Sequence, residues 1–189
     1  MKTAGRIVLP ALVLAIVAIG SQQSVSPGRG KVIYVSTAGP QYTVEELSAR
    51  ATIVALVRTI DGGAVHWNNE ENTEWSPSPN SGKAALIVRD SQAVVLKSFR
   101  GNMSELSFRT VGGVAAGVEM VFDNGPHLTQ GGAYIVFLED VAWPSQEGSE
   151  RVFAPIGEGQ GIFALSDAGL YENSAGLQLS DSLDLGSEG

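Results

Sequence analysis

Short apolar runs separated by turn-forming residues dominate the chain after residue 40. Leu106, Phe108 and Thr110 alternate with Ser107 and Arg109, and a period of two is typical of a strand with one buried face. Gly and Pro clusters separate the runs and favour turns over helices there. The runs expected to form strands are 52–59, 84–99, 106–111, 118–123, 133–138, 151–156 and 161–165.

Two of these runs carry further information. Residues 84–99 are apolar except for a polar interruption at 89–92, which contains neither Gly nor Asn. This pattern favours one long strand with a β-bulge over a hairpin. Residues 133–138 are apolar on both faces, which indicates a central strand. The polar stretch 64–83 is expected to be a long loop, and loops of that length are often functional.

A single helix is predicted. Thr43 and Glu46 have the spacing of a capping box, in which each side chain bonds the other residue's backbone N–H, so a short helix should cover 44–50. With one helix and many short strands, the body should be a mostly β sandwich or barrel. Mostly antiparallel pairing is expected, because no crossover helices separate the strands.

The N-terminus has the pattern of an export signal. Lys2 and Arg6 precede the apolar run Ile7–Ile19. As a helix this run would be about 20 Å long, whereas a membrane-spanning helix needs about 20 residues, or about 30 Å. Small residues end it and predict cleavage between Gly20 and Ser21.

The domain organisation follows. We expect a signal peptide at 1–20, a linker at 21–40 with a possible edge strand at 31–35, a β domain at 41–172, and an acidic, disordered tail at 173–189. The chain should be secreted or held in the cell envelope, and a membrane is a partner only if the leader stays uncleaved.

Composition and net charge limit the chemistry and the classes of binding partner that are expected for this chain. The 189 residues include no cysteine, which excludes disulfides and thiolate chemistry. The net charge is −8, and removal of Lys2 and Arg6 leaves 10 basic residues against 20 acidic ones. An acidic body argues against nucleic acid, whose phosphates need clustered Lys and Arg.

Several short motifs resemble a known architecture. Residues 94–101 resemble the long strand, ending in a basic residue and Gly, of netrin-like OB barrels, and 131–138 resemble their Gly-x-x-Tyr strand. Gly112-Gly113 and Gln160-Gly161 stand where poorly characterised exported bacterial proteins of this kind carry Gly-Gly and Gln-Gly.

The resemblance, over about 42–166, implies a closed, OB-like antiparallel barrel with one short N-terminal helix; a β-sandwich is the alternative. Tissue inhibitors of metalloproteinases share this module and chelate the protease zinc through an N-terminal Cys. This chain has no Cys, so no functional residue is carried over.

The sequence offers little for catalysis. His66 and His127 lie in predicted loops, without a second His at metal-ligand spacing. The oxygen-rich stretch 68–74 lacks the Asp/Asn alternation and mid-loop Gly of a calcium loop, and the Gly repeat at 157–161 precedes no helix. We therefore expect no catalytic, metal-binding or cofactor-binding residue and no cofactor.

Three tryptophans are the candidate partner contacts. Trp67 and Trp75 flank the acidic part of the long loop, and Trp143 follows the central strand. The binding hypothesis predicts that Trp67 and Trp75 are exposed near each other, where indoles could stack on a glycan or anchor a protein or peptide. The alternative is that they fold back to cap the end of the barrel. The leading hypothesis is an exported, non-catalytic binding module of unknown ligand. A small exported hydrolase and a leader-anchored envelope protein are the alternatives.

Overall fold

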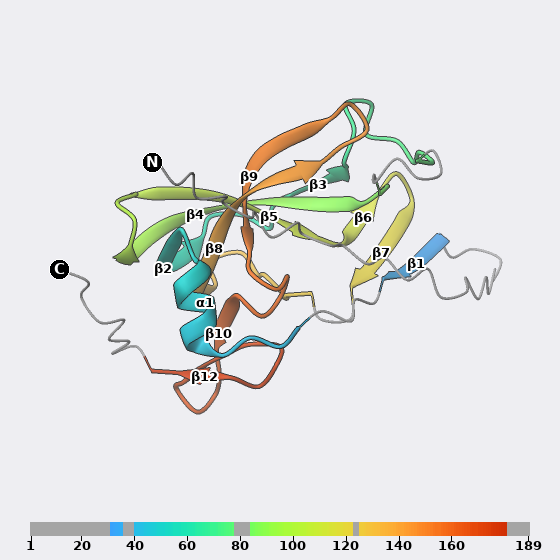
Figure 1. The fold of residues 1–189 in the computed structure, drawn as a ribbon. Helices are drawn as coiled ribbons and strands as arrows, with labels where there is room; N and C mark the ends of the chain where they lie inside the picture. The colour runs from blue at the N-terminus through green and yellow to red at the C-terminus, as the bar shows by residue number, and fades with distance from the viewer. Residues whose placement is uncertain (1–30, 36–39, 78–83, 123–124, 181–189) are drawn as a thin grey trace, which may run out of the picture.

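The computed structural model describes residues 31–35, 40–77, 84–122 and 125–180, and this part of the chain is mostly β with one helix, α1 (Val44–Arg50) (Figure 1). The predicted leader lies outside the described residues. The strands are β1 (Lys31–Val35), β2 (Ile53–Thr59), β3 (Ala64–Trp67), β4 (Ile87–Arg100), β5 (Glu105–Val111), β6 (Gly113–Ala115), β7 (Val118–Phe122), β8 (Ala133–Pro144), β9 (Ser149–Pro155), β10 (Ile162–Leu165), β11 (Tyr171–Glu172) and β12 (Gln178–Leu179).

Two long strands organise a nine-stranded antiparallel sheet. The first half of β4 pairs with β3 and β5, and its second half pairs with β2. Similarly, β8 pairs with β2 and β10 through its first half and with β9 through its second half. Each long strand therefore belongs to both halves of the molecule.

The prediction of one long strand over 84–99 is confirmed by β4. Its irregularities, however, lie away from the polar interruption. The register against β2 skips Leu96 and Phe99, whereas residues 88–94 pair with β5 without a break. The polar side chains of the interruption are thus paired across the sheet, and the bulges lie where β4 bends toward β2.

The edges of β5 and β9 face one another. Some of their Cα atoms come within 8 Å, yet no backbone hydrogen bond joins the two strands within the described residues. The mostly β, largely antiparallel fold is confirmed, but the described strands do not form a closed barrel.

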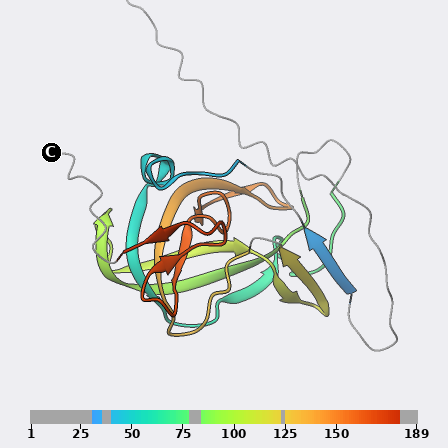
Figure 2. The same cartoon turned by 90° about the horizontal axis from the view of Figure 1, so that it is seen from below.

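A second, three-stranded sheet contains β1, β7 and β6, and lies at one end of the molecule (Figures 1 and 2). The possible edge strand at 31–35 is confirmed as β1. It pairs with β7 in parallel, Lys31 opposite Val118, so the described strands are not all antiparallel.

Both faces of β2 and β8 are buried. Ala55, Val57 and Val136 face one apolar cluster, whereas Val54 and Phe137 face another that includes Leu47 of α1 and the terminal strands. Figure 2 shows α1 on the outside of the strands that it covers. A third cluster lies between the small sheet and β3 and β4.

Local signals at the helix were correct. Thr43 accepts a hydrogen bond from the backbone of Glu46, and the Glu46 carboxylate accepts one from the backbone of Thr43, as the capping box predicted. Among the described residues, no helix is long and apolar enough to cross a membrane.

Three other sequence predictions need correction. The expected loop 64–83 begins with a strand, β3, which pairs with β4. Trp143 lies within β8 instead of in a loop after it. The start of the expected disordered tail is ordered, because β12 pairs with β11 and buries Leu179 in the cluster beneath α1.

Candidate functional site

Polar side chains converge on one face of β3, β4 and β5. Asp90 of β4 lies directly opposite Arg109 of β5. His66 of β3 lies opposite Val88, two residues from Asp90, and residues two apart on a strand share a face. The pleat and the register therefore bring His66, Asp90 and Arg109 together.

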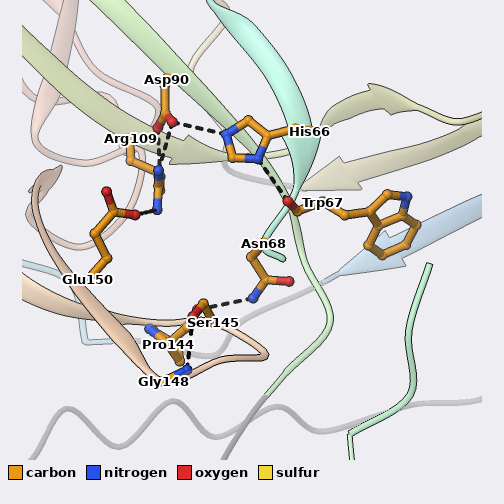
Figure 3. Close-up of polar contacts among 9 residues, drawn as sticks. All are labelled: His66, Trp67, Asn68, Asp90, Arg109, Pro144, Ser145, Gly148 and Glu150. Atoms are coloured by element: carbon orange, nitrogen blue, oxygen red, sulfur yellow. Dashed lines mark hydrogen bonds and ion pairs between the residues drawn. The ribbon is translucent and has the colours of Figure 1, made fainter. Parts of the chain in front are cut away.

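Through hydrogen bonds and ion pairs, these side chains form a chain that continues to β9 and is called the ion-pair chain below (Figure 3). Arg109 donates two parallel hydrogen bonds to Asp90, at 2.6 Å from Nε and 2.7 Å from Nη2. Its Nη1 donates a third to Glu150 of β9, at 2.9 Å. The Nε2 of His66 lies 3.0 Å from Asp90. The two-pronged contact with Asp90 fixes the plane of the guanidinium.

The side chains of this ion-pair chain differ sharply in their exposure to solvent. The Arg109 side chain is 8% exposed, that of Asp90 31%, and that of Glu150 62%. Removing a buried guanidinium from water is costly unless its N–H groups are bonded, and here each of its nitrogens has a partner.

The pKa values follow from these contacts. Burial alone would raise the pKa of Asp90, but hydrogen bonds from Arg109 and His66, together with the Arg109 charge, hold it below its usual range. Hydrogen bonds to Asp90 raise the pKa of Arg109, against the opposing effect of burial, and Glu150 adds to the rise. Both groups are therefore charged at neutral pH.

His66 has no ring nitrogen available for a reactant. Its Nδ1 lies 2.8 Å from the carbonyl oxygen of Trp67, and its Nε2 faces Asp90. A general base that activates a serine must direct one nitrogen at the hydroxyl. In the described part of the chain, neither His66 nor His127 hydrogen bonds a serine side chain. This geometry does not provide the triad that a hydrolase of this type requires.

A groove of about 240 Å³, here called the β5–β9 groove, lies beside this ion-pair chain. It is lined by Asp90, residues 107–109 of β5 and residues 150–153 of β9. Consecutive residues of a strand point to opposite faces, so a lining of consecutive residues shows that the strand edges themselves border the groove. Arg109 and Glu150 meet across it.

The three candidate tryptophans lie in different surroundings. The expectation that Trp67 is exposed was wrong, because its side chain is 1% exposed and packs between the small sheet and β4. In Figure 3 its indole points away from Asp90 and Arg109. Trp75 and Trp143 are half-buried against the same apolar cluster, and Trp143 also lines a cavity of about 40 Å³ with Arg109.

Asn68 explains the position of Trp75. Its amide nitrogen donates to the carbonyls of Ala84 and Pro144, at 2.8 and 3.1 Å. Its amide oxygen accepts from the Trp75 indole, at 3.0 Å, and from the Leu86 backbone, at 2.8 Å. The oxygen-rich loop is thus a structural junction, and no metal-binding group of acidic or His residues occurs among the residues that the structure describes.

Comparison with known proteins gives no further assignment. No protein family, curated protein or solved structure matches this chain.

Sequence reasoning did not identify Asp90, Arg109 and Glu150 as a group. One signal was available, because polar residues at 89–92 interrupt an otherwise apolar strand. Such an interruption indicates that the polar side chains have partners, since unpaired buried charges are costly. The identity of the partners required the strand register, which depends on contacts between distant parts of the chain.

Proposed function

We propose that this protein is an exported, non-catalytic binding module whose partner docks in the β5–β9 groove. The observation that carries the proposal is the groove itself, bordered by two strand edges and by a buried, fixed cation, Arg109. Unpaired strand edges offer backbone donors and acceptors to a partner, and a fixed charge adds orientation.

The occupied nitrogens of His66 support binding over catalysis. The arrangement around Asp90 orients the imidazole but leaves it no reactant to act on. Asp90 and Glu150 both pair with Arg109 beside the groove, and such sets of ion pairs also occur as purely structural networks.

The leader supports the location. We propose that cleavage before Ser21 releases the body to the exterior or the cell envelope, with a membrane contact only in an uncleaved form. Partners of suitable chemistry are a protein, a peptide or a glycan. Trp75 and Trp143 remain proposed contacts, and Trp143 lies opposite Glu150 beside the groove, whereas the burial of Trp67 removes it from the set.

We further propose that the body is an OB-like barrel of the netrin-like kind, with its seam at β5 and β9. Two observations support this: the long, bent strands β4 and β8 each serve both halves, and one short helix covers the outside of the sheet. Ligand binding on one face and its loops is common in OB barrels.

Fragment screening by NMR tests the site. A ¹⁵N-labelled sample of residues 21–189 would be titrated with a library of small polar and aromatic fragments. We expect saturable shifts of amides in β5 and β9. Val152→Trp, which fills the groove, should abolish them, whereas Val114→Trp, at a 61% exposed position on the small sheet, should leave them unchanged. Shifts that survive Val152→Trp would place the binding surface elsewhere.

A further inference from the structure

The β5–β9 groove contains a cation whose partners differ in how easily they can be replaced. Asp90 holds Arg109 by two hydrogen bonds from the neighbouring strand, and it is itself bonded to His66. Glu150 holds only Nη1, by one hydrogen bond, from the opposite side of the groove. Displacement of Glu150 would leave the rest of the ion-pair chain intact.

The displacement of Glu150 from Arg109 should cost little free energy, because the Glu150 side chain is exposed. Its side chain is 62% exposed, on the exposed first half of β9, so the freed carboxylate would be hydrated at once. Ion pairs with so exposed a member typically contribute only about 0–1 kcal/mol. The intrinsic carboxylate is therefore a weak competitor for Arg109.

Arg109, in contrast, needs an acceptor. Its side chain is 8% exposed, and a buried donor without a partner costs about 1–3 kcal/mol, more when it is charged. A ligand that replaces Glu150 must therefore present an acceptor to Nη1, and a carboxylate is the strongest choice because the hydrogen bond is charge-assisted.

The remaining lining of the groove indicates which chemical group the ligand should carry beside its carboxylate. Val152 of β9 shares a face with Glu150, two residues before it, and its half-buried side chain gives the groove an apolar surface, whereas Phe153 packs against the core cluster on the opposite face. The volume of about 240 Å³ is below the roughly 300–1,000 Å³ of drug-sized sites. A small apolar group attached to a carboxylate fits both the size and the lining.

Resting on the function proposed above, we infer that the β5–β9 groove binds a small carboxylate with a branched apolar body, which replaces Glu150 on Nη1 of Arg109. The C-terminal residue of a peptide and a free aliphatic acid share this chemistry. The open strand edges favour the peptide, because its backbone can add hydrogen bonds there.

N-acetyl-leucine is the first probe, and its amide, N-acetyl-leucinamide, is the matched control. In ¹⁵N NMR titrations, the acid should shift the Arg109 side-chain N–H signal and the β5 and β9 amides saturably. The amide should bind at least tenfold more weakly. Equal binding of the two compounds would overturn the inference.

Two substitutions test the displacement. Glu150→Gln removes the competing charge and should tighten binding of N-acetyl-leucine about threefold or more. Arg109→Gln should abolish it. If that variant does not fold, Glu150→Gln alone decides the matter, because unchanged or weaker binding in this folded variant contradicts displacement. Glu147→Gln, at an exposed position outside the groove lining, is the control and should bind as the wild type does.

Two further probes distinguish a peptide C-terminus from a free aliphatic acid as the source of the carboxylate. N-acetyl-Ala-Ala-Leu should bind at least fivefold more tightly than 4-methylpentanoate if the ligand is a peptide terminus, and equal affinity would identify a free acid. If neither acid binds, but other fragments bind in the groove and Val152→Trp abolishes their binding, this inference is refuted and the proposed function still stands. No ligand of any kind in the groove would refute both.

Discussion

The indole nitrogen of Trp75 donates a hydrogen bond to the side-chain oxygen of Asn68, at 3.0 Å. Asn68 is 2% exposed, and its amide also bonds two backbone carbonyls and one backbone N–H. One amide thus joins the segment after β3, the segment before β4 and the end of β8. A loop with the composition of a metal or glycan site is held together by this residue.

Asn68→Ala should therefore destabilise the protein strongly. The change removes four hydrogen bonds and leaves their backbone and indole partners in a buried position. At about 1 kcal/mol for each bond, the loss should be about 3–4 kcal/mol. Urea unfolding measures it. Asn102→Ala, at an exposed turn, should change the free energy of unfolding by less than about 0.5 kcal/mol. A similar small effect at Asn68 would contradict its role as a junction.

Asp90→Asn tests the ion-pair chain. The change keeps the shape of the side chain but removes the charge that balances the buried guanidinium of Arg109. Breaking a buried pair costs about 3–5 kcal/mol, and the 31% exposure of Asp90 reduces the expectation to about 2 kcal/mol. A double-mutant cycle with Arg109→Met should show coupling between the two changes, whereas additive effects would mean that the contact contributes nothing.

The same pair predicts a pH dependence. The pKa of Asp90 is lower in the folded protein than in the unfolded chain, where it is about 3.9. Its carboxylate thus stabilises the fold fully above about pH 4, and this stabilisation is lost as the pH falls through the lower native value. The stability advantage of the wild type over Asp90→Asn should be present at pH 5 and shrink below pH 4. A difference that persists at pH 2.5 would argue against the lowered pKa.

Gly161 offers a test of packing with a matched control. A Cβ at this position would lie 2.6 Å from the carbonyl oxygen of Phe137 and 2.7 Å from the backbone nitrogen of Ile156. Both are backbone atoms, so Gly161→Ala must shift β8 or the segment that follows β9 and should cost more than about 2 kcal/mol. Gly148→Ala meets no atom within 4 Å and should be neutral. Thermal unfolding of both variants makes the comparison, and equal midpoints would show that the backbones of Phe137 and Ile156 do not lie so close to Gly161.

Thr43→Ala tests the helix start. Loss of the hydroxyl that accepts from Glu46 should destabilise the protein by about 1 kcal/mol, and Thr43→Ser should restore most of it. Urea unfolding and far-ultraviolet circular dichroism measure the effect. No change on Thr43→Ala would mean that α1 is held by the packing of Leu47 alone.

The sequence predicted the elements that local chemistry determines. The capping box located α1, and alternation located β5 and β7, because these patterns involve residues close in the chain. It missed β3, since a strand of four residues that includes His66 has no clear alternation. Sequence patterns also cannot show that β1 pairs with β7, because that register depends on distant residues.

The candidate site likewise has some features that local sequence reveals and others that depend on distant residues. The aromatic residues were visible, but their burial depends on which strands cover them, and Trp67 lies beneath the small sheet. The ion-pair chain joins β3, β4, β5 and β9, so no sequence spacing encodes it. Only the polar residues within an apolar strand indicated that Asp90 had a partner elsewhere.

The pairing of β1 with β7 also constrains the order of folding. A chain that emerges from a ribosome or a membrane pore presents Lys31–Val35 early, and Val118–Phe122 only after the strands between them. Until then the backbone of β1 lacks the strand with which it pairs, and contacts between residues so far apart in the chain form slowly. β1 can therefore be placed only after β7 has been made, whereas the strands between them, such as β4 and β5, can pair with one another before that.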